Sequence, residues 1–331
     1  QVNKKAKLPS IDLDGLVAHP EAKKLIELVP PQPLYYALKN RGLTESLDVL
    51  EIIPDSTLKR LLDYDTWRED RLCPEKVFQW LNLYHSISPK KLFQRYSKLE
   101  EELQVALLGP YLKIYSKDEF EDLEDMQQDC AVALPGEEIY YHILTDDEKI
   151  RTSIQNLIDS CLQEDINYTI SLLYHAAYLP LNEQEHNLAR FRKARIEEDG
   201  FVSYEESLSF FRHFCRKSFD LRWQKMLPKK DLHPAKKNNQ VLLIDQVVSL
   251  WKSENPGHTS LKEMQLSRGL LHLTNGLLAA SKFEADDIKG LEVVLLQAKS
   301  LVNLGLDYAS SSDLETASLI LEKEYPKTLF Q

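Results

Sequence analysis

Glycine is scarce in this sequence. Only 10 of the 331 residues are glycine, about 3% where roughly 7% is usual in globular proteins. The glycine patterns of a phosphate-binding loop, a dinucleotide-binding turn and a nucleophile elbow are all absent. Gly42, Gly109 and Gly200 instead follow stretches of helical periodicity, where a left-handed residue often ends a helix. The sequence therefore predicts helices and excludes these common catalytic motifs.

Cysteines and long apolar runs are also few. Cys73, Cys130, Cys161 and Cys215 stand far apart with no CxxC pair, which excludes a disulfide scaffold and is typical of reduced cysteines in a cytosolic protein. The longest apolar stretches fall well short of the ~18 uninterrupted residues of a membrane span. We therefore expect a soluble, cytoplasmic protein that does not contact a membrane.

Acidic residues outnumber basic ones. The sequence has 41 Lys and Arg against 52 Asp and Glu, a formal net charge of −11. This balance argues against nucleic acid as a partner, because phosphate backbones require clustered cations. We interpret the basic stretch 222–237 as a solvated loop. The acidic stretch 118–129 is interpreted as a solvated linker, because it lacks the ligand spacing and central glycine of a calcium loop.

Prolines begin short helices in the first hundred residues. A proline followed three or four residues later by an apolar residue occurs at Pro31, Pro54, Pro74 and Pro89, and again at Pro326. A missing N–H costs nothing at the first position of a helix. Spacings of about 15 to 23 residues are typical of short helices stacked in pairs. The pattern predicts a helical superhelix.

Helix patterns continue through the rest of the chain. Apolar spacing predicts one long helix over 90–108, another from Asp146 onward, and a buried central helix over 288–308. Capping boxes, which satisfy two N–H groups at a helix start, are formed by three pairs. These are Ser203 with Glu206, Ser260 with Glu263, and Ser312 with Glu315.

Strand patterns are confined to a small part of the chain. Residues 138–144 and 111–115 predict a small β-hairpin. The predicted fold class is therefore all-α, with stacked short helices. The acidic stretch suggests a domain boundary, which gives an N-terminal helical array over 1–117, a linker with the hairpin over 118–144, and a C-terminal helical domain over 145–331.

Metal-binding patterns are incomplete. His213 and Cys215 are two residues apart, a spacing that a helix places on different faces. Glu183 and His186 match half of a di-iron motif, which requires a second such pair, and the sequence has none. We therefore expect no metal site and no cofactor.

One predicted helix, over 183–199, carries a group of polar side chains suited to a ligand. His186, Arg190, Arg192 and Arg195 lie on it, and Glu206 follows at the start of the next helix. Guanidinium groups bind carboxylates and phosphates in bidentate fashion, so the group can frame an anionic small ligand.

A structural role is the alternative for these arginines, and we favour it. In this interpretation Arg190 and Arg195 pair with nearby carboxylates and fix the turn between two helices. The candidate carboxylates are those of Glu197, Asp199, Glu205 and Glu206.

Aromatic and charged residues near the N-terminus are candidates for contact with a partner. Tyr35 and Tyr36 are suitable contact residues, although core packing explains them equally well. Trp67, Asp70 and Arg71 form a charged kink, a pattern that is more often a capped corner than a site.

The last candidate, Asn303, lies within an apolar run. A buried amide without hydrogen bonds costs about 1–3 kcal/mol. We therefore interpret Asn303 as a packing device, together with the nearby Gly305, which permits close approach of another helix.

Three segments, 65–74, 190–206 and 301–308, carry a resemblance to a bacterial family of uncharacterised proteins that is known only as a domain of unknown function. Phe191 stands where that family has a tryptophan. The resemblance implies a cytoplasmic bacterial protein, implies no activity, and implies a chain that continues a few residues past Phe330. The proline-led helices are also similar in architecture to the N-terminal helical superhelix of bacterial magnesium transporters, but function does not follow from a fold.

Two functions are consistent with these patterns. The first is a non-enzymatic scaffold or adaptor that binds another protein, favoured by the stacked helices, the acidic charge and the lack of a complete catalytic motif. The alternative is an enzyme or sensor that binds an anionic small ligand at the helix carrying Arg190 and Arg195.

Overall fold

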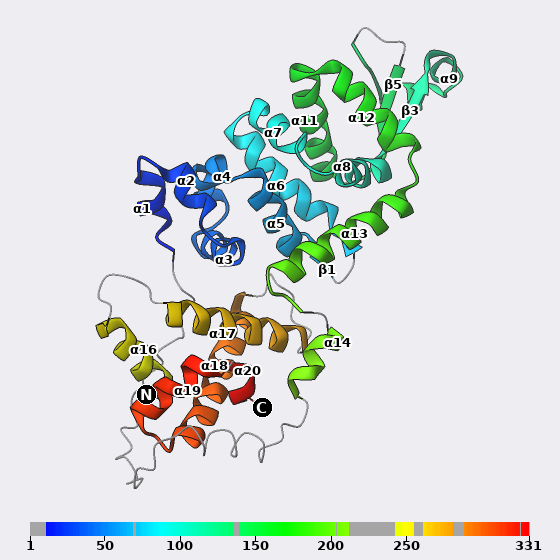
Figure 1. Ribbon diagram of the computed structural model, residues 1–331. Helices are drawn as coiled ribbons and strands as arrows, with labels where there is room; N and C mark the ends of the chain where they lie inside the picture. The colour runs from blue at the N-terminus through cyan, green and yellow to red at the C-terminus, as the bar shows by residue number, and fades with distance from the viewer. Residues whose placement is uncertain are drawn as a thin grey trace. The chain divides into compact units, whose positions relative to one another are not determined.

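The structure, a computed structural model, is mostly α-helical (Figure 1). It describes residues 11–68, 71–135, 139–202, 204–211, 242–254, 261–280, 288–324 and 326–330. The chain divides into two compact units, the first ending at Asp199 and the second beginning at Gly200. The division therefore falls at Gly200 and not within 118–144.

The described residues of 118–144 belong to the first unit and form helices and strands there. The acidic stretch forms helices α9 (Lys117–Glu121) and α10 (Asp125–Gln128), and α9 begins with a complete capping box made by Ser116 and Glu119. The ring of Phe120 in α9 stacks on Tyr140 with centroids 3.8 Å apart. These contacts make the stretch part of the first unit and not an open linker.

Short helices make up most of the first unit. Its other helices are α1 (Leu13–Ala18), α2 (Ala22–Glu27), α3 (Pro31–Arg41), α4 (Leu47–Ile52), α5 (Asp55–Asp65), α6 (Pro74–Ile87), α7 (Pro89–Tyr96), α8 (Glu101–Leu108), α11 (Glu148–Glu164), α12 (Ile166–Tyr178) and α13 (Leu181–Glu198), with 3₁₀ turns η1 (Thr44–Ser46) and η2 (Gly109–Tyr111). Three of them begin with a proline, as the sequence predicts, and Pro54 directly precedes α5.

The long helix predicted over 90–108 is wrong, because the chain turns between α7 and α8. The buried amide of Gln104 stabilises this turn: its Nε2 donates to the carbonyls of Tyr96 (3.2 Å) and Leu99 (2.9 Å). The Tyr96 hydroxyl in turn donates to the carbonyl of Gln104 at 3.2 Å. A polar side chain thus replaces the helical hydrogen bonds lost at the break.

The predicted pairing of the strands at 111–115 and 138–144 is confirmed. Strands β3 (Leu112–Ser116), β5 (Ile139–Ile143) and β4 (Ala131–Ala133) form an antiparallel sheet in the order β3-β5-β4, with Ile114 opposite Tyr141. Strand β4 was not predicted. A second pair, β1 (Trp67–Arg68) and β2 (Arg71–Leu72), forms a short hairpin.

The second unit is built around a long helix, α18 (Ile288–Ser310), as Figure 1 shows. Helices α16, α17, α19 and α20 all contact it. The elements of this unit are α14 (Tyr204–Ser207), η3 (Leu208–Phe211), α16 (Leu243–Glu254), α17 (Leu261–Ala280), α18, α19 (Leu314–Lys323) and α20 (Pro326–Phe330).

Two glycines permit close packing in this unit. A Cβ at Gly305 of α18 would overlap the carbonyl oxygen of Leu329 in α20, and a Cβ at Gly276 of α17 would overlap the ring of Phe210 in η3. The predicted role of Gly305 in close helix approach is therefore confirmed.

Of the three predicted capping boxes, only the one at Ser312 can be compared with the structure, and there the cap is a different residue. Helix α19 begins one residue later than expected, because Asp313 accepts a hydrogen bond from the N–H of Thr316 at 2.9 Å. Ser312 has a φ of 65° and lies before the cap. Ser203 and Ser260, on which the other two predicted boxes rest, lie outside the described residues.

The prediction that α18 is a buried central helix holds for one face only. Its buried side chains, which point into the unit, are Leu291, Val294, Ala298, Val302 and Leu306. The opposite face is also apolar but exposed, because none of the described helices covers it.

Candidate functional site

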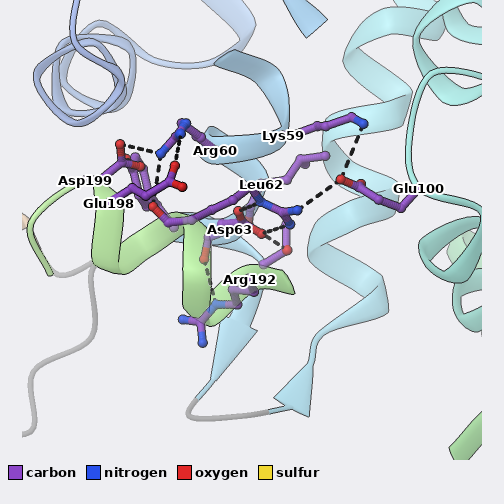
Figure 2. Close-up of polar contacts among 11 residues, drawn as sticks. Lys59, Arg60, Leu62, Asp63, Glu100, Arg192, Glu198 and Asp199 are labelled. Carbon is purple, nitrogen blue, oxygen red and sulfur yellow. Dashed lines mark hydrogen bonds and ion pairs between the residues drawn. The ribbon is translucent and has the colours of Figure 1, made fainter. Parts of the chain in front are cut away.

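The predicted ligand-binding helix is α13, and its C-terminal end lies against α5 and the start of α8 (Figure 2). Helix α5 presents Lys59, Arg60 and Asp63 toward it, and Glu100 stands at the residue before α8. We call these residues, with Arg192, Arg195, Glu198 and Asp199, the arginine cluster.

Arg195 and Asp63 are the central pair of the arginine cluster. Arg195 Nε donates to Asp63 Oδ2 at 2.6 Å, and Nη2 donates to Oδ1 at 2.9 Å. The third nitrogen, Nη1, donates to Glu100 Oε1 at 3.0 Å, and Lys59 Nζ lies 3.3 Å from the same oxygen. The two ends of the Arg195 fork are therefore occupied by carboxylates of the protein.

Arg60 fixes the C-terminal end of α13. Its Nη1 donates to Asp199 Oδ1 at 2.5 Å and to the backbone carbonyl of Arg195 at 3.0 Å, and its Nη2 donates to Glu198 at 2.7 Å. The hydroxyl of Tyr64 also donates to Asp199. A cation beside the last carbonyls of a helix stabilises that helix end.

Burial governs the electrostatics of this cluster. The Asp63 side chain is only 4% exposed, and this burial raises the pKa of its carboxyl group despite the opposing bond and charge of Arg195. Burial lowers the pKa of Arg195, but the hydrogen bond and charge of Asp63, together with the charge of Glu100, raise it further, so the pKa lies above its usual value. The two residues therefore form an internal ion pair, in which each side chain compensates the charge of the other.

Little space remains inside the arginine cluster. A cavity of about 10 Å³ is lined by Asp63, Glu100, Arg195 and Trp67, among others. This volume holds about one water molecule. A nucleotide or a small organic anion does not fit there.

Arg192 also points inward. Its Nε donates to the backbone carbonyl of Asp63 at 3.1 Å, and its guanidinium lies 5.1 Å from the centroid of the Trp67 ring. Trp67 is buried, so it is a packing residue. Arg71 is exposed in β2, and Asp70 lies outside the described residues.

The other predicted ligand-binding residues lie elsewhere. His186 and Arg190 are exposed on α13, and the guanidinium of Arg190 lies 5.3 Å from the ring of its neighbour Phe191. Glu206 is exposed in α14 of the second unit. The structure thus brings Arg192 and Arg195 together but leaves His186 and Arg190 outside the arginine cluster.

The structural interpretation of Arg195 named the wrong partners. The pairing was expected with carboxylates close in sequence, but Arg195 pairs with Asp63 and Glu100, 132 and 95 residues away. Asp199, one of the expected partners, pairs with Arg60. Spacing within one helix reports only neighbours three or four residues apart, so it could not indicate these contacts.

A second buried carboxylate, Asp65, is the hydrogen-bond partner of Tyr35. Tyr35 Oη and Lys39 Nζ donate to Asp65 Oδ1 at 2.8 and 2.9 Å, and Trp80 Nε1 donates to Oδ2 at 2.7 Å. Burial raises the pKa of Asp65, but Lys39 and the other donors outweigh it, so the pKa lies below its usual value. Tyr35 and Tyr36 are both buried, which corrects their interpretation as contact residues.

Asn303 has a structural partner. Its Oδ1 accepts a hydrogen bond from the backbone N–H of Ile244 at 3.0 Å. Ile244 lies in the first turn of α16, where N–H groups have no partner within the helix. Asn303 is therefore a packing device, as predicted, and not an interaction residue.

Metal-binding groups and membrane-spanning helices are both absent from the part of the chain that the structure describes. In these ranges His, Cys, Asp and Glu form no group of three or more suited to a metal ion. No described helix is both long enough and apolar enough to cross a bilayer.

Comparison with known protein families identifies the family of this chain. A model described as a family of unknown function, DUF6178, matches residues 8–331. The chain belongs to this family. The DUF6178 match includes all three segments that carry the resemblance, 65–74, 190–206 and 301–308. No curated protein and no solved structure matches the chain. The similarity of its proline-led helices to the magnesium-transporter superhelix therefore stays a prediction.

Proposed function

We propose that this DUF6178 protein is a non-enzymatic scaffold or adaptor that binds another protein. The observation that carries the proposal is the exposed apolar face of α18. Four of its exposed large side chains, which we call the α18 stripe, are Val293, Leu296, Leu301 and Leu304. Tyr308, which is 53% exposed, lies on the same side near the C-terminal end of the helix. Leu304 is 65% exposed and Val293 is 55% exposed.

The four side chains of the α18 stripe lie on one side of the helix. At 3.6 residues per turn they fall within an arc of about 140°. The exposed residues between them, Gln297 and Ser300, carry no charge. A contiguous exposed apolar surface of this kind marks an interaction site more often than scattered apolar residues do.

Covering the α18 stripe would be favourable. Full burial of a leucine or valine side chain stabilises by about 1.5–3 kcal/mol relative to exposure. Leu304 and Val293 are more than half exposed, so much of this free energy is still available to a partner.

The anionic-ligand alternative has less support. Arg195 donates to Asp63 and Glu100, Arg192 donates to a backbone carbonyl, and the cavity beside them holds about one water molecule. A ligand at this place would have to break an internal ion pair, which costs several kcal/mol.

Capture and reconstitution test the proposed function. The affinity-tagged full chain is used to capture proteins from a lysate of its native cells, and a stoichiometric partner is purified and titrated against the chain by calorimetry. We expect saturable binding of one defined partner. Failure to recover any partner, together with a specific rise in melting temperature on addition of a small anion, would overturn the proposal in favour of the ligand-binding alternative.

A further inference from the structure

The α18 stripe has acidic residues along one edge. Glu292 and Asp307 lie on the side of the helix that carries Leu296, one toward each end of the stripe. Lys299, also on this side, is neutralised by Asp245 of α16, which lies 2.6 Å from its Nζ. Two carboxylates, those of Glu292 and Asp307, therefore lie along one edge of the apolar surface.

The size of the stripe indicates the kind of partner. A standard protein–protein interface uses roughly 20–30 residues a side, whereas the α18 stripe has four large side chains on one helix. A single amphipathic helix matches such a surface, because its apolar residues also recur every three or four positions. The small side chain of Ser300 at the centre lets another helix approach closely.

The charge of the chain argues against a second copy of it as the partner that covers the α18 stripe. Two copies that pair through their stripes would bring Glu292 and Asp307 of each copy near those of the other. Each copy also carries a net charge of −11. Like charges that face each other across an interface are unfavourable.

We propose that the α18 stripe binds one amphipathic helix of a partner protein, whose apolar face covers the stripe and whose Lys or Arg residues face Glu292 and Asp307. The inference rests on the proposed function and specifies the surface and the chemistry of its partner. Rim charges of this kind increase the association rate and make it sensitive to salt.

A pair of synthetic peptides tests the charge and the surface together. The first is a helical peptide with leucines every three or four residues flanked by lysines, and the second has glutamates in place of the lysines. Fluorescence anisotropy measures binding of each peptide to the full chain. We expect the basic peptide to bind at least tenfold more tightly than the acidic one, and to lose affinity as salt increases.

Substitutions locate the binding surface. Leu304→Gln should weaken binding of the basic peptide at least tenfold, and Val293→Gln should also weaken it. Leu28→Gln, at a 79% exposed leucine of the first unit, is the matched control and should leave binding unchanged. Equal binding of the two peptides, or equal binding by the Leu304→Gln and Leu28→Gln chains, would overturn the proposal.

Cross-linking identifies the occupant. A photoreactive amino acid replaces Leu304, and the purified full chain is irradiated with the basic peptide present. A peptide adduct is expected. A predominant cross-link within the chain, or to a second copy, would overturn the proposal by showing a different occupant. If a partner is captured and reconstituted but no peptide adduct forms, this inference fails while the proposed function stands.

Discussion

Arg195 and Asp63 form a bidentate ion pair that joins α13 to α5. The two residues are 132 positions apart in the sequence, so the pair closes a long loop of chain within the first unit. Asp63 is the more buried partner, and its charge is compensated chiefly by Arg195. The pair therefore stabilises the end of α13.

Removal of Arg195 should destabilise the first unit strongly. In Arg195→Met the Asp63 carboxylate stays buried without its partner, and breaking a buried pair in this way costs about 3 kcal/mol or more. Arg190→Met is the matched control, since Arg190 is exposed on the same helix and an exposed substitution changes stability by less than about 0.5 kcal/mol. Urea unfolding followed by circular dichroism measures both. Similar midpoints for the two variants would contradict a stabilising role for the pair.

Asp65→Asn should change how stability depends on pH. The pKa of Asp65 is lowered in the folded protein, so its contribution is present above the unfolded value of about 3.9 and is lost as pH falls through the folded pKa. We expect the decrease in melting temperature caused by Asp65→Asn to be largest at pH 7 and to become smaller as the pH falls below about 3.9. Scanning fluorimetry at pH 7, 5, 4 and 3 measures this. A deficit that is the same at every pH would show that the charge of Asp65 contributes nothing.

Asn303→Ala should loosen the start of α16. The substitution removes the acceptor of the Ile244 N–H, and loss of a side-chain cap costs about 0.5–2 kcal/mol. Asn303→Asp puts a carboxylate oxygen in the place of the amide oxygen as acceptor and should retain most of the protection. Amide hydrogen exchange in the first turn of α16 distinguishes the two variants. Equal protection in Asn303→Ala and wild type would mean that the bond is dispensable.

Gly305→Ala should disturb the contact of α18 with α20. A methyl group at this position overlaps the Leu329 carbonyl, and forcing extra volume into a packed site costs about 1–3 kcal/mol. Ser300→Ala, on the exposed face of the same helix, should be neutral or slightly stabilising because alanine favours helices. Thermal unfolding of both variants tests the difference, and an unchanged melting temperature for Gly305→Ala would show that α20 can shift without cost.

Local patterns in the sequence predicted the helices well. Pro31, Pro74 and Pro89 each begin a helix, and the periodic stretch after Asp146 forms α11. These predictions succeed because a helix start depends on a few neighbouring residues. The break at 97–100 was missed because it depends on the amide of Gln104, whose contacts with the turn form only once the chain has folded back.

The candidate site was harder to predict, because its residues come from separate helices. Arg192 and Arg195 were recognised, but their contacts with Asp63 and Glu100 form only when α13 packs on α5 and α8. Outside this site, the structural role of the buried Arg95 was also not predicted, for the same reason. Its Nη2 donates to backbone carbonyls at the end of α4, including that of Ile53 at 2.7 Å, and no local pattern marks such a partner.

Hydrophobic periodicity also has a limit in α18. The helix is apolar on most faces, which predicted complete burial. The structure buries the side that carries Val302 and exposes the side that carries Leu304. Composition alone does not distinguish an apolar face that packs within the chain from one that remains for a partner.

The ring of Phe210 occupies the space that any side chain at position 276 would need. This overlap restricts how the two positions can change during evolution. A methyl group at 276 is tolerated only after the aromatic ring at 210 has been replaced by something smaller, so the reverse order of mutation passes through a disrupted protein. Relatives in the same family should therefore not combine a side chain at position 276 with an aromatic ring at position 210.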